Sequence, residues 1–244
     1  MLLKDRFVTL GAFLFKHRSL IPIPFALVVL IFLIHQHFRH SIRYPVGYEL
    51  ICFGVAIVGL MIRAFTIGYS RGRTSGRNTR SQMADSLNTD GLYSIVRNPL
   101  YLGNYLNVLG ISLLFPYYEV IVINTLLFIF FYVPIIFQEE DFLLQKFQDA
   151  YLEYSRRTPA VIPNPLLWKR PALKFNFIRV LYREYNTFMG VIFGFAAIEA
   201  IHDFVLLRKL IFDIPWTPVF IGSLIIWIVL RTQKRRLKAL DTAA

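Results

Sequence analysis

Residues 119–137 read EVIVINTLLFIFFYVPIIF and carry a single charged side chain, Glu119. A helix needs about 20 predominantly apolar residues to cross the hydrocarbon core of a bilayer, so this run predicts a transmembrane helix. The whole chain agrees, because 56% of its 244 residues are hydrophobic and only 17% are charged. In soluble domains, about 45–50% of residues are apolar and about 25% are charged. This composition argues against a disordered tail, a fibrous protein and an ordinary soluble enzyme.

Six apolar stretches divide the chain and predict an all-α, multi-pass integral membrane helical bundle of about six transmembrane helices. The expected spans cover about 20–34, 46–67, 100–118, 119–137, 188–207 and 214–230. Basic residues precede the first stretch, as in a signal peptide, but no small-residue cleavage site follows it. We therefore expect a retained helix. The third and fourth stretches adjoin each other and predict a tight helical hairpin.

The 27 Lys and Arg residues are distributed unevenly around these spans. With the loops assigned alternately to the two sides of the bilayer, 22 of them lie on one side and 4 on the other. The positive-inside rule then predicts that both termini and both long loops face the cytoplasm, at the inner membrane if the protein is bacterial. Basic loops against anionic lipid headgroups account for the net charge of +12 without a nucleic-acid partner.

The spans and loops divide the chain into three regions. Residues 1–70 hold a basic segment and two spans, residues 71–165 a polar loop, the hairpin and an acidic helix, and residues 166–244 a basic linker and two spans. We expect the middle region to be the functional core, because polar segments that meet the bilayer tend to carry function. A single cysteine, Cys52, excludes a cysteine-based metal cluster, and with only five histidines no metal site is expected.

Residues that could take part in a reaction lie where the hairpin begins and where it ends. Gly91–Tyr101, GLYSIVRNPLY, leads into the third span, and Glu139 and Glu140 follow the fourth. A hairpin returns the chain to the face from which it left, so Arg97 and Glu140 should lie at the same face of the bilayer. The usual glycine-rich nucleotide signatures are absent from the sequence.

An amphipathic helix is expected to begin near Gln138. Its apolar face is formed at helical spacing by Leu143, Leu144, Phe147, Tyr151 and Tyr154. Glu140 falls on this face, and a carboxylate in an apolar environment is costly unless it meets a cation, so Arg97 is its candidate partner. Two simpler interpretations stay open: acidic residues favour a helix N-terminus, and an arginine at headgroup level can snorkel into lipid.

Other arginines carry separate expectations. Arginine binds phosphate with a bidentate fork, so we expect a phosphorylated headgroup to bind at Arg73, Arg77 and Arg80. The positive-inside rule explains the same cluster without any ligand. Arg63, inside the second span, is expected to pair with a carboxylate such as Glu49 or to reach the cytoplasmic interface.

The order Gly-x-Tyr, Arg-x-Pro-x-Tyr, Glu-Glu and Tyr-x-x-Tyr resembles that of the isoprenylcysteine carboxyl methyltransferase and phospholipid methyltransferase superfamily. Its members are integral membrane enzymes that use S-adenosylmethionine, and the resemblance covers roughly residues 74–163. It implies a cytoplasmic-face cofactor pocket between the loop before the hairpin and the helix after it.

The resemblance also implies roles for individual residues. Separately from the resemblance, we expect Arg97 and Glu140 to be the catalytic pair, because topology places both at one membrane face, where each is costly without a purpose. The implied cofactor-binding residues are Asn78, Asp85, Ser86, Leu87, Asn88, Tyr93, Asn98, Pro99, Leu100, Tyr101, Glu139 and Glu140. Asn98 stands where the family usually has histidine, so no step can use a histidine proton there. The eukaryotic prenylcysteine enzymes have an arginine just before the acidic pair, and residues 132–137 contain none.

We therefore expect methyl transfer from S-adenosylmethionine to a membrane lipid or lipidated acceptor, foremost the O-methylation of an anionic phosphate headgroup. The loop Thr74–Asn78 looks like the bacterial branch that methylates a lipid A phosphate. One alternative is a sterol-type membrane reductase using NADPH, whose related motif usually has asparagine where Leu100 stands. The other is a non-catalytic transporter or scaffold, which should show polar groups near mid-bilayer in several spans.

Overall fold

The computed structural model describes residues 3–39, 45–71, 84–115, 117–207 and 216–243. All named elements in these ranges are helices. The α-helices are α1 (Leu3–Lys16), α2 (Pro22–Arg39), α3 (Val46–Tyr69), α4 (Leu92–Ile95), α5 (Pro99–Ser112), α6 (Tyr118–Arg157), α7 (Phe177–Leu207), α8 (Trp216–Thr232) and α9 (Lys234–Ala243). Two 3₁₀ turns, η1 (Arg18–Leu20) and η2 (Pro165–Leu167), join α1 to α2 and interrupt the loop after α6.

The predicted apolar stretches are largely helical, in α2, α3, α5, α6, α7 and α8. Two of these helices, α3 and α6, are long and apolar enough to cross a membrane alone. Two bent pairs, α1 with α2 and α8 with α9, pass the same test together, so the described residues contain two to four candidate spans. The number six stays a prediction. Helix α5 has 14 residues, about 21 Å of helix, and is short for a span.

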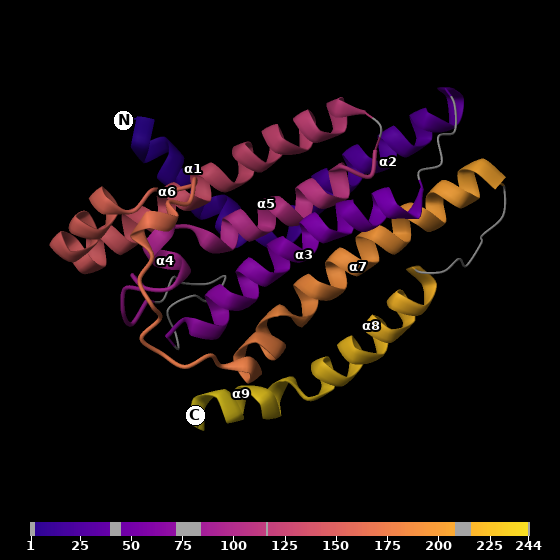
Figure 1. Ribbon diagram of the computed structural model, residues 1–244. Coiled ribbons are helices and arrows are strands. Elements are labelled where there is room, and N and C mark those ends of the chain that lie inside the picture. Colours follow the sequence, from indigo (N-terminus) through magenta and orange to yellow (C-terminus); the bar gives the residue numbers. More distant parts are fainter. Residues whose placement is uncertain (1–2, 40–44, 72–83, 116, 208–215, 244) are drawn as a thin grey trace.

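The bundle is elongated, with α3, α5 and α7 side by side along it (Figure 1). Close backbone contact between α3 and α5 depends on glycines. A Cβ on Gly59 would lie 2.6 Å from the carbonyl oxygen of Gly103, and a Cβ on Gly103 would lie 2.7 Å from that of Gly59. Small residues let helices approach in this way inside membranes, and here they bring Arg63 beside the start of α5.

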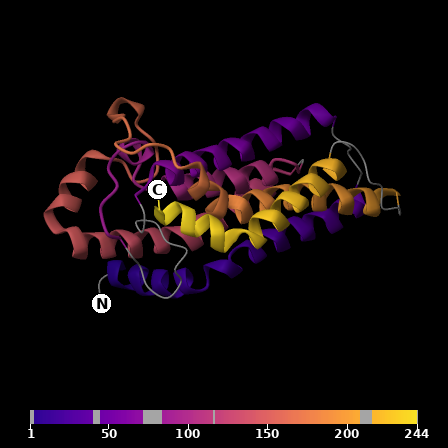
Figure 2. The same ribbon diagram turned by 90° about the horizontal axis from the view of Figure 1, so that it is seen from below.

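Helix α1 lies across the middle of α6, near the end of the bundle that holds α4 (Figures 1 and 2). Gly11 faces the Pro134 carbonyl so closely that any side chain would collide with it. Pro134 removes one backbone hydrogen bond from α6, and the ring of Phe7 stacks on Phe137 at 5.4 Å. The N-terminal helix is therefore part of the packed structure at this end.

The prediction of a separate helix beginning near Gln138 is wrong. Helix α6 continues through that point, because no helix-breaking residue stands between Pro134 and Gln148. At Gln148 the backbone has φ 45° and ψ −118°, and α6 then bends back on itself (Figures 1 and 2). This turn separates Phe147 from Tyr151, so the expected continuous apolar face is interrupted.

Helices α7 and α8 pack against α3 through a core that includes Cys52, Ala56, Phe195 and Trp216. Near the C-terminus, Asp241 of α9 is buried and accepts hydrogen bonds from three groups of the segment that begins α7. The donors are Asn176 Nδ2 (2.9 Å), Arg179 Nε (2.8 Å) and the Tyr182 hydroxyl (2.8 Å). Helix α9 is thereby fastened to the same end of the bundle as α4 (Figure 1).

Candidate functional site

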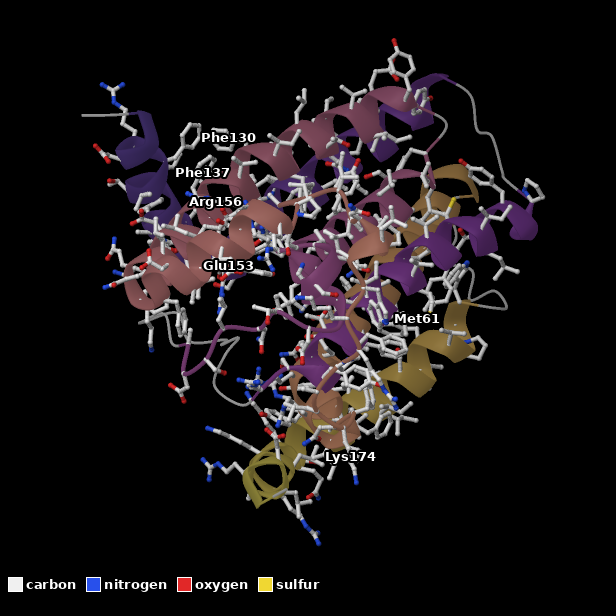
Figure 3. All side chains as sticks on the ribbon, turned by 60° about the vertical axis from the view of Figure 1, so that its left-hand side comes forward. Met61, Phe130, Phe137, Glu153, Arg156 and Lys174 are labelled. Atoms are coloured by element: carbon white, nitrogen blue, oxygen red, sulfur yellow. The ribbon has the colours of Figure 1, made fainter. Side chains whose placement is uncertain are left out.

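A cavity of about 570 Å³ lies at the α4 end of the bundle. Its walls come from η1, α3, the segment before α4, the start of α5, α6 and the first turns of α7. Ligand sites of small molecules usually measure about 300–1,000 Å³. Figure 3 labels Phe130 and Phe137 on the apolar part of α6, and Glu153 and Arg156 on the part that bends back. This bend brings two distant parts of one helix to the cavity.

Arg97 and Glu140 meet there, as predicted from the hairpin. Arg97 Nε lies 3.0 Å from Glu140 Oε1, and Nη2 lies 3.1 Å from Oε2, which makes a bidentate pair. The Arg97 and Glu140 side chains are 17% and 22% exposed. Arg97 Nη1 also donates to the carbonyl of Ser155 (2.7 Å) in the returning part of α6 and to that of Thr158 (2.9 Å) directly after the helix. The pair therefore ties both ends of the hairpin to the chain that follows it.

Asn98 strengthens this connection. Its Nδ2 donates to Glu140 Oε1 at 3.2 Å and to the Ala160 carbonyl at 3.1 Å. Glu140 thus accepts three hydrogen bonds, two from Arg97 and one from Asn98, which directly precede α5. The asparagine therefore works here as a hydrogen-bonding group that helps to hold the Glu140 carboxylate in place.

The adjacent acid, Glu139, has different surroundings. It lines the cavity together with Tyr101 and Tyr132, whose ring centroids are 5.4 Å apart. The Tyr101 hydroxyl lies beside its carboxylate, and Arg18 of η1 is near enough to act on it electrostatically. A carboxylate among aromatic rings is an environment that attracts a cation.

Gly91 provides the unusual backbone conformation with which α4 begins. Its φ of 56° and ψ of −135° are rarely adopted by residues with a side chain. The Gly91 amide donates to the Lys169 carbonyl at 3.0 Å, and the Asn164 amide donates to the Ile95 carbonyl at 2.9 Å. The segment after α6 is therefore laid along α4, where Tyr154 Oη also donates to the Tyr93 carbonyl at 2.8 Å. Burial raises the pKa of Tyr93 above its usual value, so its hydroxyl stays protonated.

Arg63 has a carboxylate partner, as expected, but this partner is not Glu49. It pairs with Glu184 of α7, with Nε 2.7 Å from Oε2 and Nη2 2.8 Å from Oε1, and its Nη1 donates to Asn104 Oδ1 at 2.6 Å. Glu49 instead accepts from Trp216 Nε1 at 2.9 Å. Glu49 is fourteen residues away on the same helix, about 21 Å along the axis, so it could not have reached Arg63.

The cavity collects most of the residues that the resemblance implied for a cofactor. Those that line it are Ser86, Leu87, Asn88, Tyr93, Asn98, Pro99, Leu100, Tyr101, Glu139 and Glu140. Asp85 is exposed and is not among the lining residues. Asn78, Arg73, Arg77 and Arg80 lie outside the described residues, so the structure does not bear on their expected roles.

Sequence reasoning missed two walls of this cavity. One is η1, with Arg18 and Ser19, and the other is the first part of α7, with Arg183 and Thr187. Neither carries a recognisable motif. The one available signal was Arg63, because a lone arginine within an apolar span calls for a carboxylate partner at the same depth.

Comparison with known proteins gives a consistent family. Residues 42–150 match the family model described as phospholipid methyltransferase. The protein-S-isoprenylcysteine O-methyltransferase of Schizosaccharomyces pombe is 34% identical over 75 residues, which cover 31% of this chain and 32% of that protein.

Two bacterial relatives carry metal-resistance names. The cobalt-zinc-cadmium resistance protein CzcN of Cupriavidus metallidurans is 29% identical over 130 residues, which cover 52% of this chain and 60% of that protein. The nickel-cobalt-cadmium resistance protein NccN of Alcaligenes xylosoxydans xylosoxydans is 30% identical over 162 residues, 66% of this chain and 71% of that protein. This chain thus matches less than two thirds of the length of the first of them. No solved structure matches the chain significantly.

Proposed function

The chain belongs to the superfamily of phospholipid methyltransferases and isoprenylcysteine carboxyl methyltransferases, and from this premise we propose that it methylates an acceptor held at the membrane. The proposed methyl donor is S-adenosylmethionine, which when bound would supply a methyl group activated by a sulfonium cation. The acceptor is a lipid or a lipidated molecule, since the family works at membranes and the bundle is apolar.

The observation that carries this proposal is the composition of the α6 wall. Glu139 stands among Tyr101 and Tyr132 in a cavity of about 570 Å³. A carboxylate and two aromatic rings suit a sulfonium cation through charge and cation–π attraction. The volume of the cavity and its carboxylate and aromatic side chains therefore fit the proposed cofactor. Glu139, Tyr93 and the Asn98–Tyr101 segment are the residues that would hold it.

Arg97 and Glu140 have a different part in the proposal. Four hydrogen bonds from Arg97 are already made within the protein, so this pair fixes the cavity wall more than it binds a ligand. Holding two reactants in a fixed geometry can supply several kcal/mol of rate enhancement. We therefore assign the pair to the catalytic machinery as the element that fixes the geometry of the site.

We favour an anionic acceptor on chemical grounds. A phosphate or carboxylate oxygen needs no general base near neutral pH, whereas an amine must lose a proton. A site with little water favours reaction between opposite charges. A phosphorylated headgroup remains our proposed acceptor, with Arg73, Arg77 and Arg80 as its expected contacts, and a lipid A phosphate is the most specific form of that proposal.

Calorimetry on the detergent-purified chain tests the cofactor. We expect binding of S-adenosylmethionine, weakened in Glu139→Gln and unchanged in Glu153→Gln, whose exposed carboxylate pairs with Arg157 at the surface. Tight binding of NADPH without binding of S-adenosylmethionine would favour the reductase. Lipid mass spectrometry of cells with and without the protein should then reveal one lipid class carrying an added methyl group.

The proposed orientation places both termini and the α4 end in the cytoplasm, on the basis of the 22-to-4 distribution of basic residues. Reporter fusions after Leu30 and after Ala244 test it. A C-terminal reporter that is active only outside the cytoplasm would overturn the even number of spans.

A further inference from the structure

Helix α7 forms one wall of the cavity although it lies beyond the family match, which ends at residue 150. Its lining residues are Arg183, Glu184, Asn186 and Thr187. Residues three and four apart share one face of a helix, so Arg183, Asn186 and Thr187 are presented together. The cavity therefore has a second polar wall on an element that no motif in the sequence marks.

This wall is fixed in place by an ion pair. Glu184 accepts both Nε and Nη2 of Arg63, and the two side chains are only 9% and 12% exposed. Because Asn104 of α5 accepts from the same guanidinium, one arginine connects α7, α3 and α5. Glu184 is thereby neutralised, and its neighbours on α7 are held at a defined level of the cavity.

The two walls differ in charge. The α6 wall presents Glu139, whereas the α7 wall presents the Arg183 guanidinium, the Thr187 hydroxyl and the Asn186 amide. Arg183 Nε also donates to Tyr182 Oη at 3.3 Å, and Asn186 Oδ1 accepts from Trp227 Nε1 at 2.9 Å, so the Asn186 group that can donate to a ligand is Nδ2. Burial raises the pKa of the Tyr93 hydroxyl of α4, and the Arg183 guanidinium acts in the opposite, lowering direction. Arginine and hydroxyl donors are the groups that recognise phosphate oxygens.

We propose that Arg183, Asn186 and Thr187 of α7 form the subsite that holds the phosphate of the acceptor lipid, opposite the carboxylate wall that holds the methyl donor. The proposal rests on the proposed function and adds the place and the residues of acceptor binding. An oxygen lone pair of the phosphate forms the new O–C bond while the electron pair of the S–C bond returns to sulfur. One positive and one negative charge disappear, and no proton is transferred.

Binding to the full chain in detergent, saturated with S-adenosylhomocysteine, tests the subsite. The probe is dioctanoyl phosphatidic acid, with dioctanoylglycerol as the same lipid without phosphate and inorganic phosphate as the same anion without lipid. We expect the chain to bind the phosphatidic acid, Arg183→Gln and Thr187→Val to weaken that binding about tenfold, and Thr187→Ser to retain it. Arg156→Gln removes an exposed arginine elsewhere (Figure 3) and should change nothing.

Each variant must bind S-adenosylhomocysteine as the original chain does, which shows that the cavity is intact. Arg183→Lys keeps the charge without the fork and provides a second, milder test if Arg183→Gln does not fold. Undiminished binding of phosphatidic acid to Arg183→Gln or Arg183→Lys, with the cofactor product bound, would overturn the subsite alone.

Equal binding of dioctanoylglycerol, or full competition by inorganic phosphate at the same concentration, would overturn the lipid-phosphate assignment. If the original chain binds phosphatidic acid through Arg183 but fails to bind S-adenosylhomocysteine in any condition, the proposed function fails while the subsite stands. The two failures are therefore distinguishable.

Discussion

The two sides of the cavity are held in different ways. On the α4–α6 side, Arg97 alone makes four hydrogen bonds, and backbone contacts join the Gly91 segment to the chain after α6. On the α7 side, the buried Arg63–Glu184 pair connects α7 to α3, and Trp227 Nε1 of α8 donates to Asn186 Oδ1 at 2.9 Å. The first side is joined mainly by contacts between residues 91 and 169, whereas α7 is joined to α3, α8 and α9 by contacts between residues far apart in the sequence.

This difference suggests a division of labour. The densely connected side coincides with the family match and holds the residues expected at the cofactor. The α7 side lies outside the match, and we expect it to bear on the acceptor more than on the donor. A substitution on the first side should affect every step, whereas one on the second should affect the acceptor more than the donor.

The largest effect is expected on the α4–α6 side. Glu140→Gln keeps the shape of the side chain but removes the charge that holds Arg97, and a misplacement of about 1 Å can cost about hundredfold in rate. We expect Arg97→Ala and Glu140→Gln to lose at least that much methyl transfer while the protein still inserts into the membrane. Radiolabel transfer from S-adenosylmethionine into extracted lipid measures it.

Glu153→Gln is the matched control for this change, because Glu153 pairs with Arg157 at the surface, where both side chains are about two-thirds exposed. Surface pairs contribute little, so activity should stay the same. Full activity in a well-folded Glu140→Gln would reduce the Arg97–Glu140 pair to an interfacial anchor and remove the contrast between the two sides.

An intermediate effect is expected on the α7 side. Arg63→Met or Glu184→Met leaves one charge buried without its partner, which can cost about 3–5 kcal/mol, whereas replacing both residues by apolar ones is often close to neutral. We expect each single variant to lower the melting temperature in detergent and the double variant to recover much of it. In the double variant, the acceptor KM should rise while affinity for S-adenosylmethionine is retained.

This experiment sharpens the comparison because stability and acceptor binding respond separately. A double variant that is stable and has an unchanged acceptor KM would mean that acceptor binding does not depend on the position in which the Arg63–Glu184 pair holds α7. Loss of cofactor affinity in the stable double variant would mean that the two sides are not independent.

The sequence predicted the better-connected side well. Apolar runs predicted the helices, because burial in lipid leaves a simple compositional trace. The hairpin predicted that Arg97 and Glu140 meet, since two adjoining helices must return to the same face. Contacts of this kind depend on short connections and can be inferred without a structure.

The α7 side could not be predicted in the same way. Glu184 lies 121 residues after Arg63, and several carboxylates could have served an unpaired arginine equally well. The turn at Gln148 leaves no glycine or proline signal at that position, so the interruption of the apolar face of α6 was missed. Long-range pairing depends on how helices pack, which local patterns do not specify.

The smallest structural change with a specific outcome concerns the basic loop before α4. Arg73, Arg77 and Arg80 are proposed to contact the acceptor, and their replacement by lysine keeps the charge that the positive-inside rule counts. Lysine cannot provide the bidentate geometry of the guanidinium. The triple lysine variant should therefore insert normally and bind S-adenosylmethionine normally, but show a raised acceptor KM.

Comparison with Arg183→Lys makes this result informative. Both variants replace the bidentate guanidinium by an ammonium group that keeps the charge, and both do so at the same proposed ligand. If both raise the KM, the loop and α7 hold the headgroup together. If Arg183→Lys alone raises it, the loop arginines serve membrane orientation and the α7 wall carries acceptor recognition. Undiminished activity of both variants would remove the argument for phosphate and return carboxylate and amine acceptors to equal standing with it.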